Sequence, residues 1–345
     1  MDPSSLINPD LMYHKLTYGD VLWATSLCAS LLGIALNALL IVAIQKTGRR
    51  LVYSRLFLVA AIFDLFFSVV EMLTQHQIAV KNGVMFLLPR GIEWWFKDGA
   101  FGINYVIFIL HCFAYMQGIF ILAALFRYRF ILAKEPHAPP SKYLDGLIVS
   151  TIGAIVCSLS AAIGVYQASK KGWSYYENVL KRSNVSTKFF MYVVDIRDFG
   201  TIGYFFGGLL LSTISFAVVI LYARQAFIQP KDEDAKTRVH QAQMTQALVF
   251  RTLTTLVFGV WPILKETSIR QLCCQKQCVV FRFDAEIFGT GMMFTWPWTA
   301  VLNAVITLFI IPPYRRYVLN SIGANIENAD ANVASPPLLN QLSNM

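Results

Sequence analysis

Three polar side chains, Asn37, Asp64 and Asn303, interrupt long apolar segments at similar depths. Each stands eight or nine residues from the polar end of its own segment, so three helices would bring them into one layer. A carboxylate surrounded by amide donors is suited to bind a cation or water and to reorganise during a conformational change. The same groups can simply join helices, at about 0.6–2 kcal/mol per contact. Because an ionisable group is costly in such a segment, we favour a link to function.

A second acid, Glu71, follows Asp64 by seven residues and shares its helix face. The two acids would also suit the coupling-ion sites of a secondary transporter, although no internal repeat and no paired broken helices accompany them. The chain contains no HExxH, GxSxG, Walker or dinucleotide-binding motif. We therefore expect no enzyme, no cofactor and no resident metal.

Other apolar segments hold a histidine and two prolines. His111 could contact a ligand or sense pH, but a lone histidine in such a segment is more often a hydrogen-bonded packing residue. Pro262 follows Trp261, and Pro297 precedes Trp298. Proline bends a helix, so each is either a hinge beside a bulky aromatic ring or a static kink.

The elements that must position these residues are seven apolar segments. Of the 345 residues, 56% are apolar and only 14% are charged, whereas about a quarter are charged in a soluble domain. The net charge of +9 is scattered between the segments, which excludes a nucleic-acid-binding surface. The composition predicts an all-α membrane protein, a seven-transmembrane helix bundle. The predicted spans are Val21–Ile44, Leu56–Leu73, Phe101–Phe126, Leu147–Tyr166, Thr201–Tyr222, Ala247–Leu264 and Ile287–Ile311.

The charges around the first span set the expected orientation. One basic residue, Lys15, precedes the span, and four follow it before the second, so we expect the N-terminus outside and the C-terminus inside. The glycosylation sequon at Asn184 then lies outside. A disulfide is expected in another outer loop, with Cys273 and Cys278 as candidates, since that cluster has too few ligands for zinc. We expect an outer tail (residues 1–20), a receptor domain (21–314) and an inner tail (315–345).

Several short motifs resemble those of the nematode serpentine chemoreceptors of the Str/Srd/Srj group, which are G-protein-coupled receptors. Phe126-Arg127-Tyr128-Arg129 is similar to the Tyr-Arg-Tyr motif of that group after span three. The stretch from Gln243 to Arg251, running into Val260-Trp261-Pro262, resembles its glutamine-rich entry to span six. Pro297 and the closing Tyr314-Arg315 resemble its span seven. The resemblance covers most of residues 20–320.

The resemblance implies a chemosensory, olfactory-type receptor in the plasma membrane of sensory neurons or their cilia. It would bind a small environmental ligand and activate a heterotrimeric G protein. The residues expected to face the G protein are Arg127, Tyr128, Arg129 and Arg251. The residues nominated for the ligand pocket are His111, Tyr115, Trp261 and Trp298. The alternative is a secondary solute transporter that uses Asp64 and Glu71.

The chain departs from rhodopsin-like receptors at three points. No acidic residue precedes Arg127, and no cysteine pair is available to link span three to the loop from Gln167 to Gly200. Pro312-Pro313-Tyr314 stands where those receptors carry Asn-Pro-x-x-Tyr. The contact that locks their inactive state is therefore not carried over to this chain.

Overall fold

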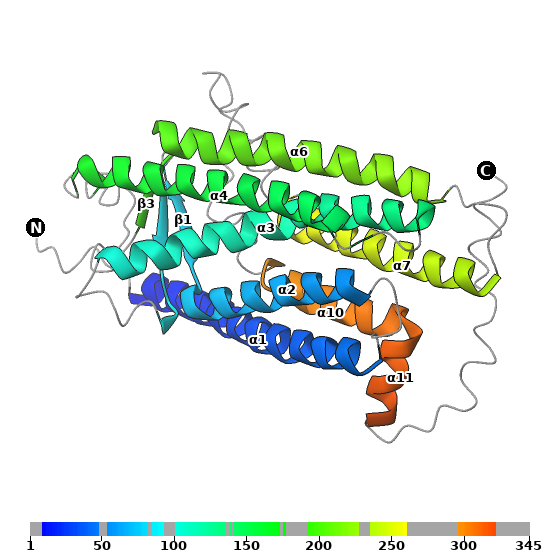
Figure 1. Cartoon of the computed structure of the whole chain (residues 1–345). Helices are drawn as coiled ribbons and strands as arrows, with labels where there is room; N and C mark the ends of the chain where they lie inside the picture. Colours follow the sequence, from blue (N-terminus) through cyan, green and yellow to red (C-terminus); the bar gives the residue numbers. More distant parts are fainter. Residues whose placement is uncertain are drawn as a thin grey trace, which may run out of the picture.

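A computed structural model describes the protein as a bundle of long helices (Figure 1). The described residues are 9–47, 54–81, 84–92, 101–135, 139, 141–172, 175–176, 192–227, 235–260 and 295–321. The helices are α1 (Pro9–Thr47), α2 (Ser54–Thr74), α3 (Phe101–Lys134), α4 (Ser141–Lys170), α6 (Phe199–Phe227), α7 (Ala235–Thr254), α10 (Trp298–Ile310) and α11 (Pro312–Ser321). A π-helix, η4 (Thr255–Val260), continues α7.

Each predicted span overlaps one helix, and five of the described helices are long and apolar enough to cross a membrane. These are α1, α2, α3, α4 and α6, while α10 is a shorter apolar helix. Helix α1 begins at Pro9 and α11 extends from Pro312 to Ser321. The helical bundle is as predicted, and the limits of the receptor domain and its two tails stay a prediction.

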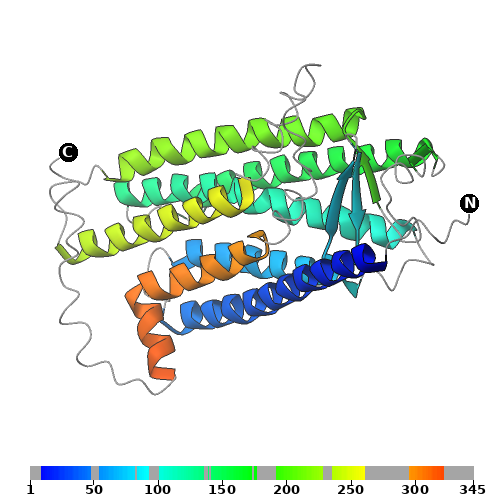
Figure 2. The ribbon, with the colours of Figure 1, turned by 180° about the vertical axis from the view of Figure 1, so that it is seen from behind.

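The bundle is organised around α3, which contacts α2, α4, α6 and α7. Buried apolar side chains fill the half nearer α11, including Leu40, Phe57, Leu125, Leu248 and Tyr314. Helices α4 and α6 present apolar side chains outward, as lipid contact requires. The short helix α11 turns away from α10 at one end of the bundle (Figures 1 and 2).

A three-stranded antiparallel sheet lies at the opposite end, beside the start of α1 (Figures 1 and 2), and we predicted no strands. Its strands, in order, are β1 (Gln77–Lys81), β2 (Val84–Leu88) and β3 (Tyr192–Asp195). Val84 pairs with Asp195 and Leu87 with Tyr192. Leu87 and Tyr192 pack against Phe108 of α3. The strands escaped prediction because runs of four or five residues between spans are too short to show alternation.

Helices α4 and α6 approach closely at two glycines. A Cβ atom on Gly200 would lie 2.3 Å from the backbone nitrogen of Gly164 and 2.7 Å from the carbonyl oxygen of Ser160. Only glycine permits this separation, which sets the distance between the two helices at the sheet end.

Candidate functional site

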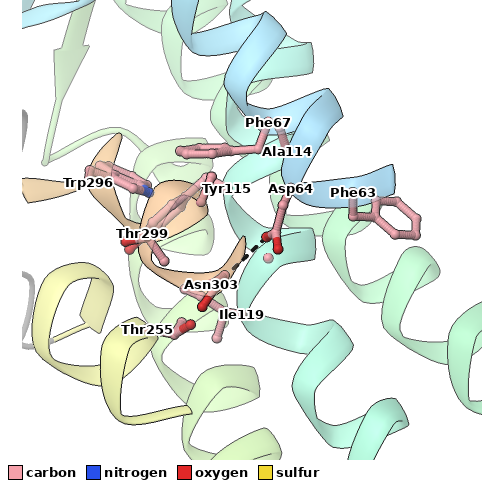
Figure 3. A pocket seen from close by; sticks show the side chains of 12 residues that line it. Phe63, Asp64, Phe67, Ala114, Tyr115, Ile119, Thr255, Trp296, Thr299 and Asn303 are labelled. Carbon is pink, nitrogen blue, oxygen red and sulfur yellow. Dashed lines mark hydrogen bonds between the residues drawn. The ribbon is translucent and has the colours of Figure 1, made fainter. Parts of the chain in front are cut away.

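Asp64 and Asn303 meet in the middle of the bundle, as their depths predicted. Asn303 Nδ2 donates a hydrogen bond of 3.2 Å to Asp64 Oδ1 (Figure 3). Arg251 Nη2 donates to the other carboxylate oxygen at 2.6 Å, and its Nη1 donates to Thr307 Oγ1 at 3.4 Å. The side chains of Arg251 and Asp64 are 2% and 13% exposed. One carboxylate, one amide and one guanidinium thus join α2, α10 and α7.

The structure corrects our placement of Arg251. We expected its side chain at the inner face, ready to meet a G protein, but it lies inside the bundle on Asp64. The physical reason is that a guanidinium in an apolar segment must find an anion, and Asp64 is 187 residues away in the chain. No local pattern around Arg251 reveals that partner.

Asn37 lies beside this layer without a hydrogen bond to the carboxylate. Its Nδ2 donates to the carbonyl oxygens of Gly33 at 2.8 Å and Ala300 at 3.3 Å. Asn37 therefore ties α1 to α10, one helical turn from Asn303. Of the three residues predicted to share a layer, two are in direct contact and the third holds the backbone of the same helix.

A small cavity of about 30 Å³ lies beside Asp64 (Figure 3). Its lining includes the aromatic rings of Phe67, Tyr115 and Trp296 and the polar side chains of Asp64, Thr255 and Asn303. A water molecule needs about 10–15 Å³ by the same measure, so the cavity has room for one or two waters. It is far too small for an organic ligand, which needs hundreds of cubic ångströms.

A second polar cluster lies nearer the sheet, around Glu71. Ser26 Oγ donates to Glu71 Oε1 at 3.3 Å, and His111 Nδ1 lies 3.6 Å from Glu71 Oε2. Thr74 Oγ1 is 3.1 Å from the same histidine nitrogen. The ring of His76 meets that of His111 edge-on, with centroids 4.8 Å apart. We missed His76 because it follows span two, where the sequence resembles a loop.

Trp296 separates the two polar regions. Its ring packs against the ring of Tyr115, and its ring centroid lies 6.1 Å from that of His111. Two of the nominated pocket residues therefore share one aromatic neighbour. Trp298, which we nominated, is half-buried and does not line the cavity. Pro297 directly precedes α10 and has helical dihedral angles (φ −59°, ψ −27°). Its role as a hinge stays a prediction.

At the end of α3 remote from the sheet, the two arginines point to different helices. Arg129 is fully buried, and its Nε donates to Thr245 Oγ1 of α7 at 3.2 Å. Its Nη2 donates to the side-chain and backbone oxygens of Gln241 at 3.2 and 3.3 Å. Arg127 is half-buried and lies close to Gly146 of α4. Tyr128 packs its ring against Tyr143 of α4.

Charged groups fasten the sheet to the end of α4. Lys171 Nζ lies 2.9 Å from Asp195 Oδ2 and 2.5 Å from Asp198 Oδ1, and Arg197 donates to both oxygens of Asp195. Burial disfavours the charged form of Asp195, but hydrogen bonds from Arg197 and Lys171 outweigh burial and lower its pKa. The pKa of Lys171 is raised, because bonds to Asp198 and Asp195 outweigh its desolvation.

The remaining predicted residues lie outside the described part of the chain: Trp261, Pro262, Asn184, Cys273 and Cys278. Within the described part, no three His, Cys, Asp or Glu side chains are grouped so that they could hold a metal ion.

Comparisons with known proteins agree with this architecture. A family model described as serpentine type 7TM GPCR chemoreceptor Str matches residues 24–319. Among solved structures, the crystal structure of squid rhodopsin is similar in fold, with a TM-score of 0.56 and 12% sequence identity. The similarity covers 95% of this chain and 91% of that one. A comparison with curated proteins found no match.

Proposed function

Because the chain belongs to the Str family of serpentine seven-transmembrane G-protein-coupled chemoreceptors, we propose that it binds a small environmental ligand and activates a heterotrimeric G protein. The observation that carries the proposal is the match over residues 24–319, which overlaps every described span. The proposal places the sheet and the N-terminal tail outside the cell, and α11 and the C-terminal tail inside. The membrane is the plasma membrane of sensory neurons or their cilia.

The proposed ligand site is the outer half of the bundle, between Trp296 and the sheet. His111, Tyr115 and the neighbouring Glu71 and His76 offer aromatic faces together with hydrogen-bonding groups. These side chains are packed against one another, so a ligand must select an arrangement in which they separate. Binding then shifts the population of the bundle by the difference in affinity between its two arrangements.

The proposed G-protein site is the inner end of α3 and α7. In the described arrangement the guanidinium of Arg129 donates its hydrogen bonds to Gln241 and Thr245. Movement of α7 away from α3 would release the guanidinium and open the inner end to a partner. Arg127 and Tyr128, on the side of α4, complete the surface that we propose for the partner.

G-protein activation in cells that express the chain tests the proposal. A panel of small organic compounds should include at least one that gives a concentration-dependent response, absent from cells without the chain. Arg127→Ala at equal surface expression should reduce that response, and a response that survives would remove Arg127 from the proposed surface. Uptake of a labelled solute without any G-protein response would contradict the proposal.

The transporter alternative is not favoured. The matching family model describes receptors. The carboxylate of Asp64 is paired with the guanidinium of Arg251, which leaves it unsuited to bind a coupling ion.

The proposed orientation has its own test in the sequon at Asn184. An N-glycosidase should increase the electrophoretic mobility of the expressed chain, and Asn184→Gln should remove that shift. A C-terminal epitope that antibodies reach on intact cells would contradict the orientation.

A further inference from the structure

The carboxylate of Asp64 has its charge compensated and both its oxygens hydrogen-bonded by side chains of this chain. Both carboxylate oxygens of Asp64 are engaged, one by Arg251 at 2.6 Å and the other by Asn303 at 3.2 Å. The guanidinium in turn reaches Thr307. A carboxylate in a membrane interior is unfavourable unless a positive charge compensates it, and here the compensating charge comes from α7.

The space beside the pair sets what else can bind there. The adjoining cavity of about 30 Å³ is lined by Asp64 and Asn303, but the strongest acceptor in it already faces a guanidinium. A metal cation entering the cavity would meet the positive charge of Arg251 on the same carboxylate. Electrostatics therefore favours water in the cavity over a free cation.

The helix that carries Arg251 changes its winding just after it. The π-helix η4 begins at Thr255, one turn beyond Arg251, and Thr255 also lines the cavity. A π-turn holds more residues per turn than an α-turn, so its conversion rotates one part of a helix against the other. Such a change would move the guanidinium of Arg251 away from the carboxylate of Asp64 without unfolding the helix.

We propose that Arg251 is the built-in counter-cation of Asp64, occupying the site that a free metal cation would otherwise take. We propose further that this pair holds α7 against α2 and α10 in the resting protein and separates on activation. The second part rests on the proposed receptor function, and the first part does not. Arg251 is thus a positioning residue, which acts through the helix that it fixes.

Thermal unfolding of the purified full chain in sodium chloride and in choline chloride of equal ionic strength tests the first part. The wild-type chain should show the same midpoint in both salts. Arg251→Gln, which leaves the carboxylate without its cation, should be less stable and should gain a saturable stabilisation by sodium. Asp64→Asn/Arg251→Gln should recover stability and lose the sodium effect.

Three outcomes would overturn the counter-cation. One is a wild-type midpoint that rises specifically with sodium and loses this rise in Asp64→Asn. Another is a double variant whose loss of stability equals the sum of the two single losses. The third is an Arg251→Gln chain that gains nothing from sodium. If Arg251→Gln cannot be purified while the double variant can, that rescue itself supports the pair.

Basal G-protein signalling at equal surface expression tests the second part. Arg251→Gln and Asp64→Asn should each raise the basal signal several-fold, and the double variant should add no further increase. Arg224→Gln and Asp145→Asn make the same chemical changes at exposed positions, so their basal signal should match the wild type. A ligand response with unchanged basal signal in both single variants would overturn the release step. If no compound gives a G-protein response in the wild type, the proposed function is contradicted. Thermal unfolding in sodium and choline chloride still tests the Asp64–Arg251 ion pair.

Discussion

Arg129 of α3 donates hydrogen bonds to both the side-chain and the backbone oxygen of Gln241 on α7, at 3.2 and 3.3 Å. The neighbouring arginine of the same motif, Arg127, points to α4 instead. Two residues along a helix rotate a side chain by roughly 200°, which explains the difference. The contact between α3 and α7 at this end of the bundle therefore depends on the second arginine of the motif.

Arg129→Gln should destabilise the protein by about 1.5–3 kcal/mol, because a buried charged donor and its bonds to Gln241 and Thr245 are lost. Thermal unfolding of the purified full chain measures the effect. Arg127→Gln should lower the thermal midpoint less, and an equal fall for both variants would contradict the assignment.

Gly200→Ala should destabilise the protein by about 1–3 kcal/mol, because the added methyl group would meet backbone atoms of α4 that cannot move away alone. Gly207→Ala on the same helix is the matched control, since a Cβ there meets nothing within 4 Å. That change should instead stabilise the helix by about 0.5–1 kcal/mol. The thermal midpoints of purified Gly200→Ala and Gly207→Ala test this prediction. Similar midpoints would contradict the close approach of α4 and α6 at Gly200.

The attachment of the sheet should depend on pH through Asp195 and Lys171. Since folding lowers the pKa of Asp195, its contribution is present above the ordinary value of 3.8 and is lost as pH falls through the lower folded pKa. Since folding raises the pKa of Lys171, its contribution is present below 10.5 and is lost as pH rises through the higher folded pKa. Amide hydrogen exchange of β3 should thus show full protection between these limits. Asp195→Asn should reduce protection at neutral pH and remove the acid-dependent loss.

Trp296→Phe should weaken a ligand response about tenfold, because the smaller ring loses its contacts with Tyr115 and His111 at the floor of the proposed pocket. Trp298→Phe makes the same change two residues away, at a side chain outside the cavity lining. The half-maximal ligand concentration should change only for the first variant. Equal shifts for both would mean that Trp296 has no special place in the site.

The sequence predicted those parts of the site that depend on depth along a helix. Asp64 and Asn303 stand at comparable distances from their helix ends, and seven packed helices then bring them together. His111 was found as an ionisable group in an apolar segment, and the structure places it beside Glu71. Depth can be counted in residues because every helix rises by the same amount per residue.

Rotation about each helix axis and pairing between distant segments could not be predicted in this way. Arg251 was assigned to the surface because nothing near it in sequence shows that Asp64 neutralises it. Trp296 and Trp298 have almost equal depths, so the sequence does not show that Trp296 and not Trp298 lines the cavity. His76 lies just beyond a span and enters the site only because the sheet folds over it.

The segment after α2 and the segment before α6 are joined by a backbone ladder between β2 and β3, with Val84 opposite Asp195 and Leu87 opposite Tyr192. No cysteine occurs between residues 77 and 100 or between 167 and 200, so the link between these two loops is not covalent. Isolated β-hairpins form their hydrogen bonds in about 1–10 μs, whereas uncatalysed rearrangement of a disulfide takes minutes to hours. This link can therefore open without breaking a covalent bond, and a reducing agent leaves it intact.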